Sequence, residues 1–352
     1  MTYESLKPLI YKLDPENAHA LAEFSMRTLD CIFPGGLSFF AKDYVVNDEI
    51  LNQEIFNLNF YNPVGLAGGF DKNATMIRPL SALGFGFLEY GTFTPKPQNG
   101  NEKPRLFRLV EQESIQNAMG FNNKGKDAIA KEVKKVYPFS IPLVANIGKN
   151  KITPNEEAIN DYIILLKEFK DLCDLFVINI SSPNTKNLRD LQSKEFVSTL
   201  FSQAKEITNK PVILKIAPDM NIDSAISLCK SAISAKADGI IMANTSIDYS
   251  LIDNARTFGG ISGKLITQKS ATFFKEVAKE IYQDTILIAS GGIDSAELAY
   301  ERIKNGASLV QIYTAMIFKG PSVVKNINQG LIELLKQDGF NHISQAIGVN
   351  FK

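Results

Sequence analysis

The residues of this sequence that are best suited to chemistry stand where an apolar run stops. The run 175–178 (LFVI) reads as a strand buried on both faces. It is followed at once by small polar residues with amide and hydroxyl groups and no formal charge: Asn179, Ser181, Ser182, Asn184 and Thr185. Such groups suit a flat, amide-rich ligand better than a phosphate or a metal. One polar turn after a strand is ordinary, so the functional interpretation depends on the same pattern elsewhere.

The pattern recurs after other apolar runs. Residues 67–72 (AGGFDK), 89–92 (EYGT) and 244–245 (NT) each follow such a run, and glycines there permit close approach to a ligand. If the strands are parallel, their carboxyl ends meet at one edge. Four asparagines are then expected to converge on one place: Asn117, Asn146, Asn179 and Asn244.

Lys215 lies in the nearly all-apolar run VILKIAPD. A buried lysine is costly unless an anionic or electron-rich group receives it. Two roles compete: a Schiff base, or stabilisation of negative charge on a cofactor. Glycine-rich segments at 259–263 and 290–293, together with the end of the last run at 311–315, suit a phosphate held by backbone N–H groups. They favour a phosphorylated cofactor.

Composition narrows the class of protein. The chain has 352 residues, of which 45% are apolar, with 38 basic and 38 acidic side chains, so nothing electrostatic indicates a nucleic-acid partner. Its three cysteines are far apart and it has only two histidines, which argues against a metal site. No run is apolar and long enough to span a membrane, and no signal peptide is recognisable.

Eight short apolar runs alternate with helical patterns from about residue 46 onward. The predicted strands are 63–67, 86–91, 142–146, 175–180, 212–216, 239–243, 285–289 and 308–312. The predicted helices between them include 156–170, 193–208, 222–235, 268–282 and 295–305. This α/β pattern predicts a (β/α)8 TIM barrel. A doubly wound sheet is the competing fold, but GLAGG at 65–69 does not match its GxGxxG fingerprint.

Residues 1–45 differ from the rest and predict a pair of helices. The second begins at Asp14-Pro15 and ends at Pro34-Gly35-Gly36. Acidic residues outnumber basic ones here, so any membrane contact would be apolar rather than electrostatic. Packing on the main domain is the simpler interpretation. The expected domains are 1–45, helical, and 46–352, the barrel.

Long motifs show a resemblance over nearly the whole chain. They are DPENAHALAE, NPVGLAGGFDKN, LEYGTFTPKPQNGNEKPRLFRL, NAMGFNNKG, NIGKNK, INISSPNT, LKIAPD, GGISGK, GGIDS and GASLVQIYTA. Through them the chain resembles the class 2, quinone-linked dihydroorotate dehydrogenases. The resemblance implies an FMN-binding barrel with an N-terminal helical domain, oxidising dihydroorotate to orotate in UMP synthesis. It also implies a membrane quinone as acceptor, peripheral attachment to the cytoplasmic side of the cell membrane, and no required partner protein.

The resemblance implies a role for individual residues of this chain, position by position. Ser182 corresponds to the base that takes a proton from C5 of dihydroorotate while hydride leaves C6 for FMN, with Thr185 and Phe121 assisting. The implied substrate contacts are Lys72, Asn117, Met119, Gly120, Phe121, Asn179, Asn184, Asn244 and Thr245. The implied cofactor contacts are Gly68, Gly69, Phe70, Asp71, Lys72, Thr92, Asn146, Asn179, Lys215, Ala243, Gly263, Gly292, Tyr313 and Thr314. The implied quinone site, in a tunnel between the N-terminal helices, is His19, Arg108 and Tyr313.

Lys215 is implied to stand beside the flavin N1/O2 edge, which displaces the Schiff-base role. Two departures from the family pattern are Ala243, where a threonine is often found, and Ala118, where some relatives have arginine. The first removes one hydroxyl near the flavin. Other interpretations are a fumarate- or NAD-coupled dehydrogenase, a lyase acting through Lys215, and a non-catalytic membrane-docked scaffold.

Overall fold

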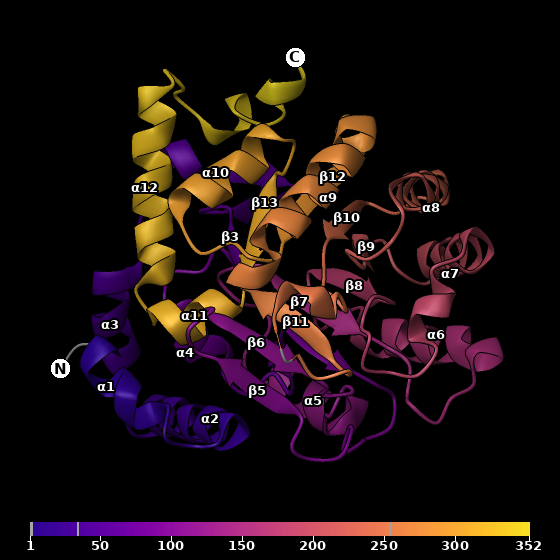
Figure 1. The fold of residues 1–352 in the computed structure, drawn as a ribbon, viewed down its shortest axis with the longest axis horizontal. Coiled ribbons are helices and arrows are strands. Elements are labelled where there is room, and N and C mark those ends of the chain that lie inside the picture. The colour runs from indigo at the N-terminus through magenta and orange to yellow at the C-terminus, as the bar shows by residue number, and fades with distance from the viewer. Residues whose placement is uncertain (1–2, 34, 254) are drawn as a thin grey trace.

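The computed structural model describes residues 3–33, 35–253 and 255–352; Pro34, the predicted end of the second helix, lies outside them. Its centre is a closed barrel of eight parallel strands in the order β10-β12-β13-β3-β4-β7-β8-β9 (Figure 1). The strands are β3 (Val64–Asp71), β4 (Phe87–Phe93), β7 (Leu143–Ile147), β8 (Leu175–Asn179), β9 (Val212–Ile216), β10 (Gly239–Met242), β12 (Ile286–Ser290) and β13 (Leu309–Ile312). Each overlaps one predicted strand, and the predicted (β/α)8 barrel is confirmed.

Helices surround this barrel. They are α4 (Ile77–Ser81), α5 (Gly125–Val133), α6 (Ala158–Phe169), α7 (Lys194–Ile207), α8 (Ile222–Ser234), α9 (Thr267–Ile281), α10 (Ala296–Lys304), α11 (Thr314–Lys319) and α12 (Val323–Gln337). In α6 the buried residues Tyr162, Leu165, Leu166 and Phe169 recur at helical spacing and form one face. Polar side chains cap the starts of α7, α8 and α10, where Ser193, Asn221 and Ser295 accept from backbone N–H groups.

The interior of the barrel is built in layers with the two-residue period of a strand. Its apolar layer contains Phe87, Val144, Val177, Ile213, Ile241, Ile288 and Leu309. Two residues further along the same strands stand Glu89, Asn146, Asn179, Lys215, Ala243, Ser290 and Gln311. Because alternate side chains face the same side, the polar residues point into the barrel directly above the apolar layer. This second layer forms the base of the site.

A small hairpin contributes to the same apolar layer. Strands β1 (Gln53–Ile55) and β2 (Leu58–Phe60) pair antiparallel. Ile55 and Phe60 belong to the cluster of the lower barrel layer, where the Phe60 and Phe87 rings meet edge to face with centroids 5.6 Å apart. Gly65 permits this packing, since a Cβ there would lie 2.1 Å from the Phe87 ring.

The N-terminal segment corrects one expectation. Its described residues form three helices rather than a pair: α1 (Tyr3–Ile10), α2 (Pro15–Ile32) and α3 (Gly36–Tyr44). Gly36 was expected to belong to the end of the second helix, but it is the first residue of α3. These helices lie together on one side of the barrel, beside β5 and α11 (Figure 1). The domain boundary at residue 45 stays a prediction.

The long segment between β4 and β7 is also more ordered than a simple loop. It contributes β5 (Leu106–Leu109) and β6 (Ser114–Asn117), which form a three-stranded sheet with β11 (Gly260–Gly263). β6 pairs antiparallel with both neighbours. This sheet joins the segment carrying Asn117 to the loop that follows β10. Gln116 Nε2 adds a hydrogen bond to Arg256 O, 140 residues further along the chain.

Candidate active site

A cavity of about 810 Å³ opens at the carboxyl ends of the barrel strands, and α2 covers part of it. Its volume lies in the range of small-molecule and cofactor sites. All of the predicted site residues line it except Asn146 and Thr185. The predicted convergence of the strand ends therefore produces one shared chamber.

A continuous chain of hydrogen bonds runs below this chamber. Asn244 Nδ2 donates to Ser181 Oγ at 2.8 Å, and Ser181 Oγ donates to Asn179 Oδ1 at 3.0 Å. Asn179 Nδ2 donates to Thr92 Oγ1 at 2.8 Å, and Thr92 Oγ1 donates to Asn146 Oδ1 at 2.5 Å. Asn146 is therefore a buried link behind the lining residues, and its side chain orients Thr92 and Asn179.

The chain ends at Glu89, a residue to which the sequence reasoning gave no role. Its carboxylate accepts from Asn146 Nδ2 and Gln311 Nε2 and pairs with Lys215 Nζ at 3.1 Å. All four side chains are buried. The ion pair suits Lys215 as a fixed cation more than as a nucleophilic amine. The lone carboxylate in the apolar strand 87–93 was the available signal.

Ser182 is buried at the end of β8, where its Oγ accepts from the backbone N–H of Asn184 at 3.2 Å. Such a donor stabilises negative charge developing on the oxygen. Thr185 Oγ1 is buried and has no hydrogen-bond partner among the described residues. The structure thus brings the predicted base to the cavity, while the hydroxyl predicted to assist it makes no hydrogen bond.

Two loops over the cavity are fastened to each other. Asn184 Nδ2 donates to Asn117 Oδ1 at 3.0 Å. Asn101 Nδ2 donates to both Ala118 O and Asn184 O at 2.9 Å. Gln98 Nε2 donates to Gly120 O and Phe121 O at 3.1 Å. Residues 98–101 therefore hold the segments carrying Phe121 and Ser182 in one arrangement, a role not predicted from sequence.

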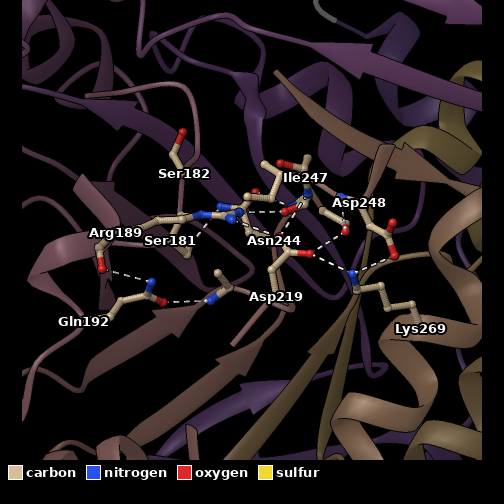
Figure 2. A network of polar contacts seen from close by, with 12 residues as sticks. Ser181, Ser182, Arg189, Gln192, Asp219, Asn244, Ile247, Asp248 and Lys269 are labelled. Carbon is tan, nitrogen blue, oxygen red and sulfur yellow. Dashed lines mark hydrogen bonds and ion pairs between the residues drawn. The ribbon is translucent and has the colours of Figure 1, made fainter. Parts of the chain in front are cut away.

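Arg189 fixes the same region from the other side (Figure 2). Its Nε donates to Ser181 O and its Nη2 to Thr245 O, both at 2.9 Å, while its Nη1 pairs with Asp219 at 2.9 Å. Asp219 also pairs with Lys269 at 3.0 Å. Burial alone would raise the pKa of Asp219, but hydrogen bonds from Ser246, Lys269, a backbone N–H and Arg189 hold it below its usual value. The network positions the residues beside Ser182 and Asn244.

Asp71, the last residue of β3, and Lys72, which follows it, both line the cavity but make different contacts. Burial lowers the pKa of Lys72 to about 8, with Glu16 opposing and Arg105 adding to the shift, and its Nζ donates to Gly69 O at 2.7 Å. An anionic ligand beside this amine would favour its charged form. The Asp71 carboxylate instead accepts from the backbone N–H groups of Thr75 and Met76 at 2.9 and 2.8 Å. It shapes the loop, so its carboxylate is not free for a ligand.

The predicted quinone residues divide into two groups. The rings of His19 and Phe70 meet edge to face at 5.1 Å, and those of Phe70 and Tyr313 at 5.5 Å, forming an aromatic row from α2 to the end of β13. Arg108 also lines the cavity but lies outside this row, and its guanidinium donates to Tyr11 O and Leu13 O at 2.9 and 2.8 Å. Tyr3 and Tyr11 in turn donate to Ile317 O on α11. Arg108 therefore anchors the turn between α1 and α2.

Burial and nearby Lys72 lower the pKa of His19 to about 4, against the opposing effects of Glu23 and the Phe70 backbone. In the unfolded chain the His19 imidazole would bind a proton near pH 6.5, whereas in the folded chain it binds one only near pH 4. We therefore expect His19 to contribute stability that is complete above about pH 6.5 and is lost as the pH falls to about 4, by up to about 3 kcal/mol.

Chemical unfolding of the protein between these pH values measures this contribution. His19→Leu should make the dependence on pH shallower. Asn17→Ala is the matched control, because Asn17 is an exposed residue of the same helix, α2, and removing its side chain removes no titratable group, so the slope should stay unchanged. An equal slope for His19→Leu and the unaltered protein would contradict the assignment.

The donors and acceptors around the cavity fit a flat cofactor with an imide edge. Four buried side-chain oxygens on residues that line the cavity have no partner among the described residues: Asn122 Oδ1, Asn184 Oδ1, Thr245 Oγ1 and Gln311 Oε1. Buried polar atoms ordinarily have partners, so this group indicates a ligand. Gly263 and Gly292, both at positive φ, line the cavity, Gly263 beside Thr314 and Gly292 beside Thr267 at the start of α9. Their N–H groups and those at the start of α9 suit a phosphate.

Fold and cavity together define a β/α-barrel enzyme that holds its ligands at the carboxyl ends of its strands. Three comparisons specify the family. A family model described as dihydroorotate dehydrogenase matches residues 50–335. Relatives named dihydroorotate dehydrogenase (quinone) from a Nitratiruptor species and from Helicobacter acinonychis are 56% and 47% identical over 352 residues, with 100% of each chain covered.

A solved structure supports the same relationship. The crystal structure of DHODH from Eimeria tenella in complex with ferulenol has a TM-score of 0.85 and 34% identity, covering 98% of this chain and 99% of that chain. This chain therefore belongs to the dihydroorotate dehydrogenase family.

Proposed function

We propose that this chain is a quinone-dependent dihydroorotate dehydrogenase that oxidises dihydroorotate to orotate in pyrimidine biosynthesis, with FMN as its cofactor. The observation that carries the proposal is the shared cavity, which is lined by buried Ser182 together with Lys72, Lys215 and the asparagine side chains. Full-length identity of 56% to a relative named for this activity supports it. Bound FMN would supply the two-electron acceptor for the substrate.

The side chains divide the work according to their chemistry. Asn117, Asn184 and Asn244 would orient the substrate ring, and the Lys72 ammonium would bind its carboxylate. Ser182 Oγ would take the proton from C5. A serine is a weak base, so the N–H of Asn184, 3.2 Å from Oγ, would stabilise the charge that develops there. The fastened loops would keep water away from the reacting atoms.

Electrons would leave through the N-terminal side of the cavity, where the quinone would approach along α2 toward the His19–Phe70–Tyr313 row. The neutral His19 imidazole is compatible with an apolar ligand. Leu9, Phe24 and Phe39 on α1, α2 and α3 expose 66%, 67% and 67% of their surface, which supports peripheral contact with a membrane. Among the described residues, none of the helices is long and apolar enough to cross a bilayer. The site of action would be the cytoplasmic face of the cell membrane.

The test is an anaerobic absorbance spectrum of the purified protein. We expect a flavin band that bleaches with dihydroorotate and returns with a soluble quinone. A protein that neither contains nor takes up FMN would refute the proposed function. A band that returns only with fumarate or NAD would retain the substrate and replace the acceptor.

A further inference from the structure

Glu89 occupies an unusual place in the barrel. It lies on β4, yet two of its three donors come from strands that are not its neighbours, Lys215 on β9 and Gln311 on β13. Its carboxylate therefore reaches across the barrel interior. Gly68 makes room for it, because a Cβ there would lie 2.4 Å from Glu89 Oε1. Among the described residues, Lys215 and Gln311 line the cavity, whereas Glu89 is not one of the lining residues.

The carboxylate determines how the Gln311 amide is turned. A carboxylate paired with a lysine only accepts hydrogen bonds, so the NH2 group of Gln311 must face it. Gln311 Oε1 is then left buried and without a partner among the described residues, on a side chain that is 1% exposed. A buried acceptor of this kind requires an N–H donor, and the cavity is where one can bind.

We propose that Glu89 is a positioning residue that sets both the affinity and the reduction potential of the bound flavin. It holds the Lys215 ammonium in place and turns the Gln311 carbonyl toward the cavity. The Glu89 carboxylate thereby positions both the Lys215 cation and the Gln311 acceptor. These two groups match the C=O and N–H groups of the imide edge of the flavin ring. This inference rests on the proposed function, since it takes the ligand to be a flavin.

The negative charge of Glu89 has a further effect. It offsets the charge of Lys215, so the pair would add little net positive charge to the surroundings of the flavin. Glu89→Gln would remove that offset and favour the reduced, anionic flavin. It would also place an NH2 group against the Gln311 amide, forcing Gln311 to turn its own NH2 into the cavity and lose the acceptor.

Spectroelectrochemistry and FMN titration of the flavin-loaded protein test these effects. We expect Glu89→Gln to raise the midpoint potential by about 30 mV or more, a tenfold change in the ratio of the affinities for reduced and oxidised flavin. FMN should bind at least about fivefold more weakly. Gln311→Met should weaken FMN binding similarly but shift the potential by less than about 10 mV, or twofold. A potential within about 10 mV of the wild-type value in Glu89→Gln would overturn the proposal.

Glu89→Asp keeps the test decisive if Glu89→Gln yields no folded protein. It retains the charge on a shorter side chain, so the potential should stay within about 10 mV and FMN should bind at least about fivefold more weakly. Unchanged affinity would contradict the positioning role.

The matched control is Asp238→Asn. Asp238 also pairs with a lysine, Lys205, but directly before β10, at the opposite end of the barrel. It should leave the potential and the FMN affinity unchanged. A wild-type protein without FMN would instead refute the proposed function, so the two failures are distinguishable.

Discussion

Replacement of Ser182 with alanine is expected to leave a protein that binds FMN normally but is reduced by dihydroorotate at least about a hundredfold more slowly. Ser182 Oγ is buried in the cavity and, within the described part of the chain, accepts only from the Asn184 N–H, so removing it deletes the proposed base and little else. Stopped-flow absorbance of the flavin band under anaerobic conditions measures the rate. An unchanged rate would remove Ser182 from the mechanism.

Ser193→Ala is an informative control for this variant. The Ser193 hydroxyl caps α7 by accepting from Phe196 N and lies outside the cavity lining. Its loss should cost about 1 kcal/mol of unfolding free energy and leave the reduction rate unchanged. Ser182→Ala should show the reverse pattern, with a slow reaction and nearly unchanged stability. The comparison separates loss of a catalytic group from general weakening of the fold.

Deletion of residues 1–45 is expected to abolish turnover with a membrane quinone while sparing reduction of the flavin by dihydroorotate. The deletion removes α1, α2 and α3, including His19 and the exposed apolar side chains, but none of the residues in the hydrogen-bonded chain from Asn244 to Glu89. Steady-state assays with a quinone, and flotation with phospholipid vesicles, provide the two measurements. The truncated protein should no longer float with vesicles.

The rate of flavin reduction is the internal control, because it reports whether the truncated barrel still holds its site. Normal reduction with retained quinone turnover would refute the assignment of the quinone route to α2. Normal reduction with continued vesicle binding would refute the proposed membrane contact.

The sequence was sufficient to predict the barrel because its strands are short apolar runs separated by amphipathic helices. Lys215 was found because an amine in an apolar strand is conspicuous. Glu89 and Gln311 carry the same signal in β4 and β13, but their importance depends on which strands face one another across the closed barrel. That relation is set by closure and cannot be deduced from one strand.

Other parts of the site had no usable signal. Arg189 acts largely through carbonyl oxygens of Ser181 and Thr245, and every residue has a carbonyl, so the partners are not marked in the sequence. The quinone-site role of Arg108 came from the resemblance and stays a prediction; that its guanidinium also bonds to the backbone of the α1–α2 turn had no signal in the sequence. The three-stranded sheet was missed because its strands have only four residues each and because β11 lies far along the chain from β5 and β6.

The way Arg189 binds has a consequence for how this site can change in evolution. The guanidinium binds backbone carbonyl oxygens in two loops. These hydrogen bonds depend on the path of the backbone and not on which side chains the loops carry. Substitutions that alter ligand preference can therefore accumulate beside Ser182 and Thr245 while the anchor remains intact. An insertion or deletion of one residue would move a carbonyl away from its donor, so loop length is constrained more tightly than loop composition.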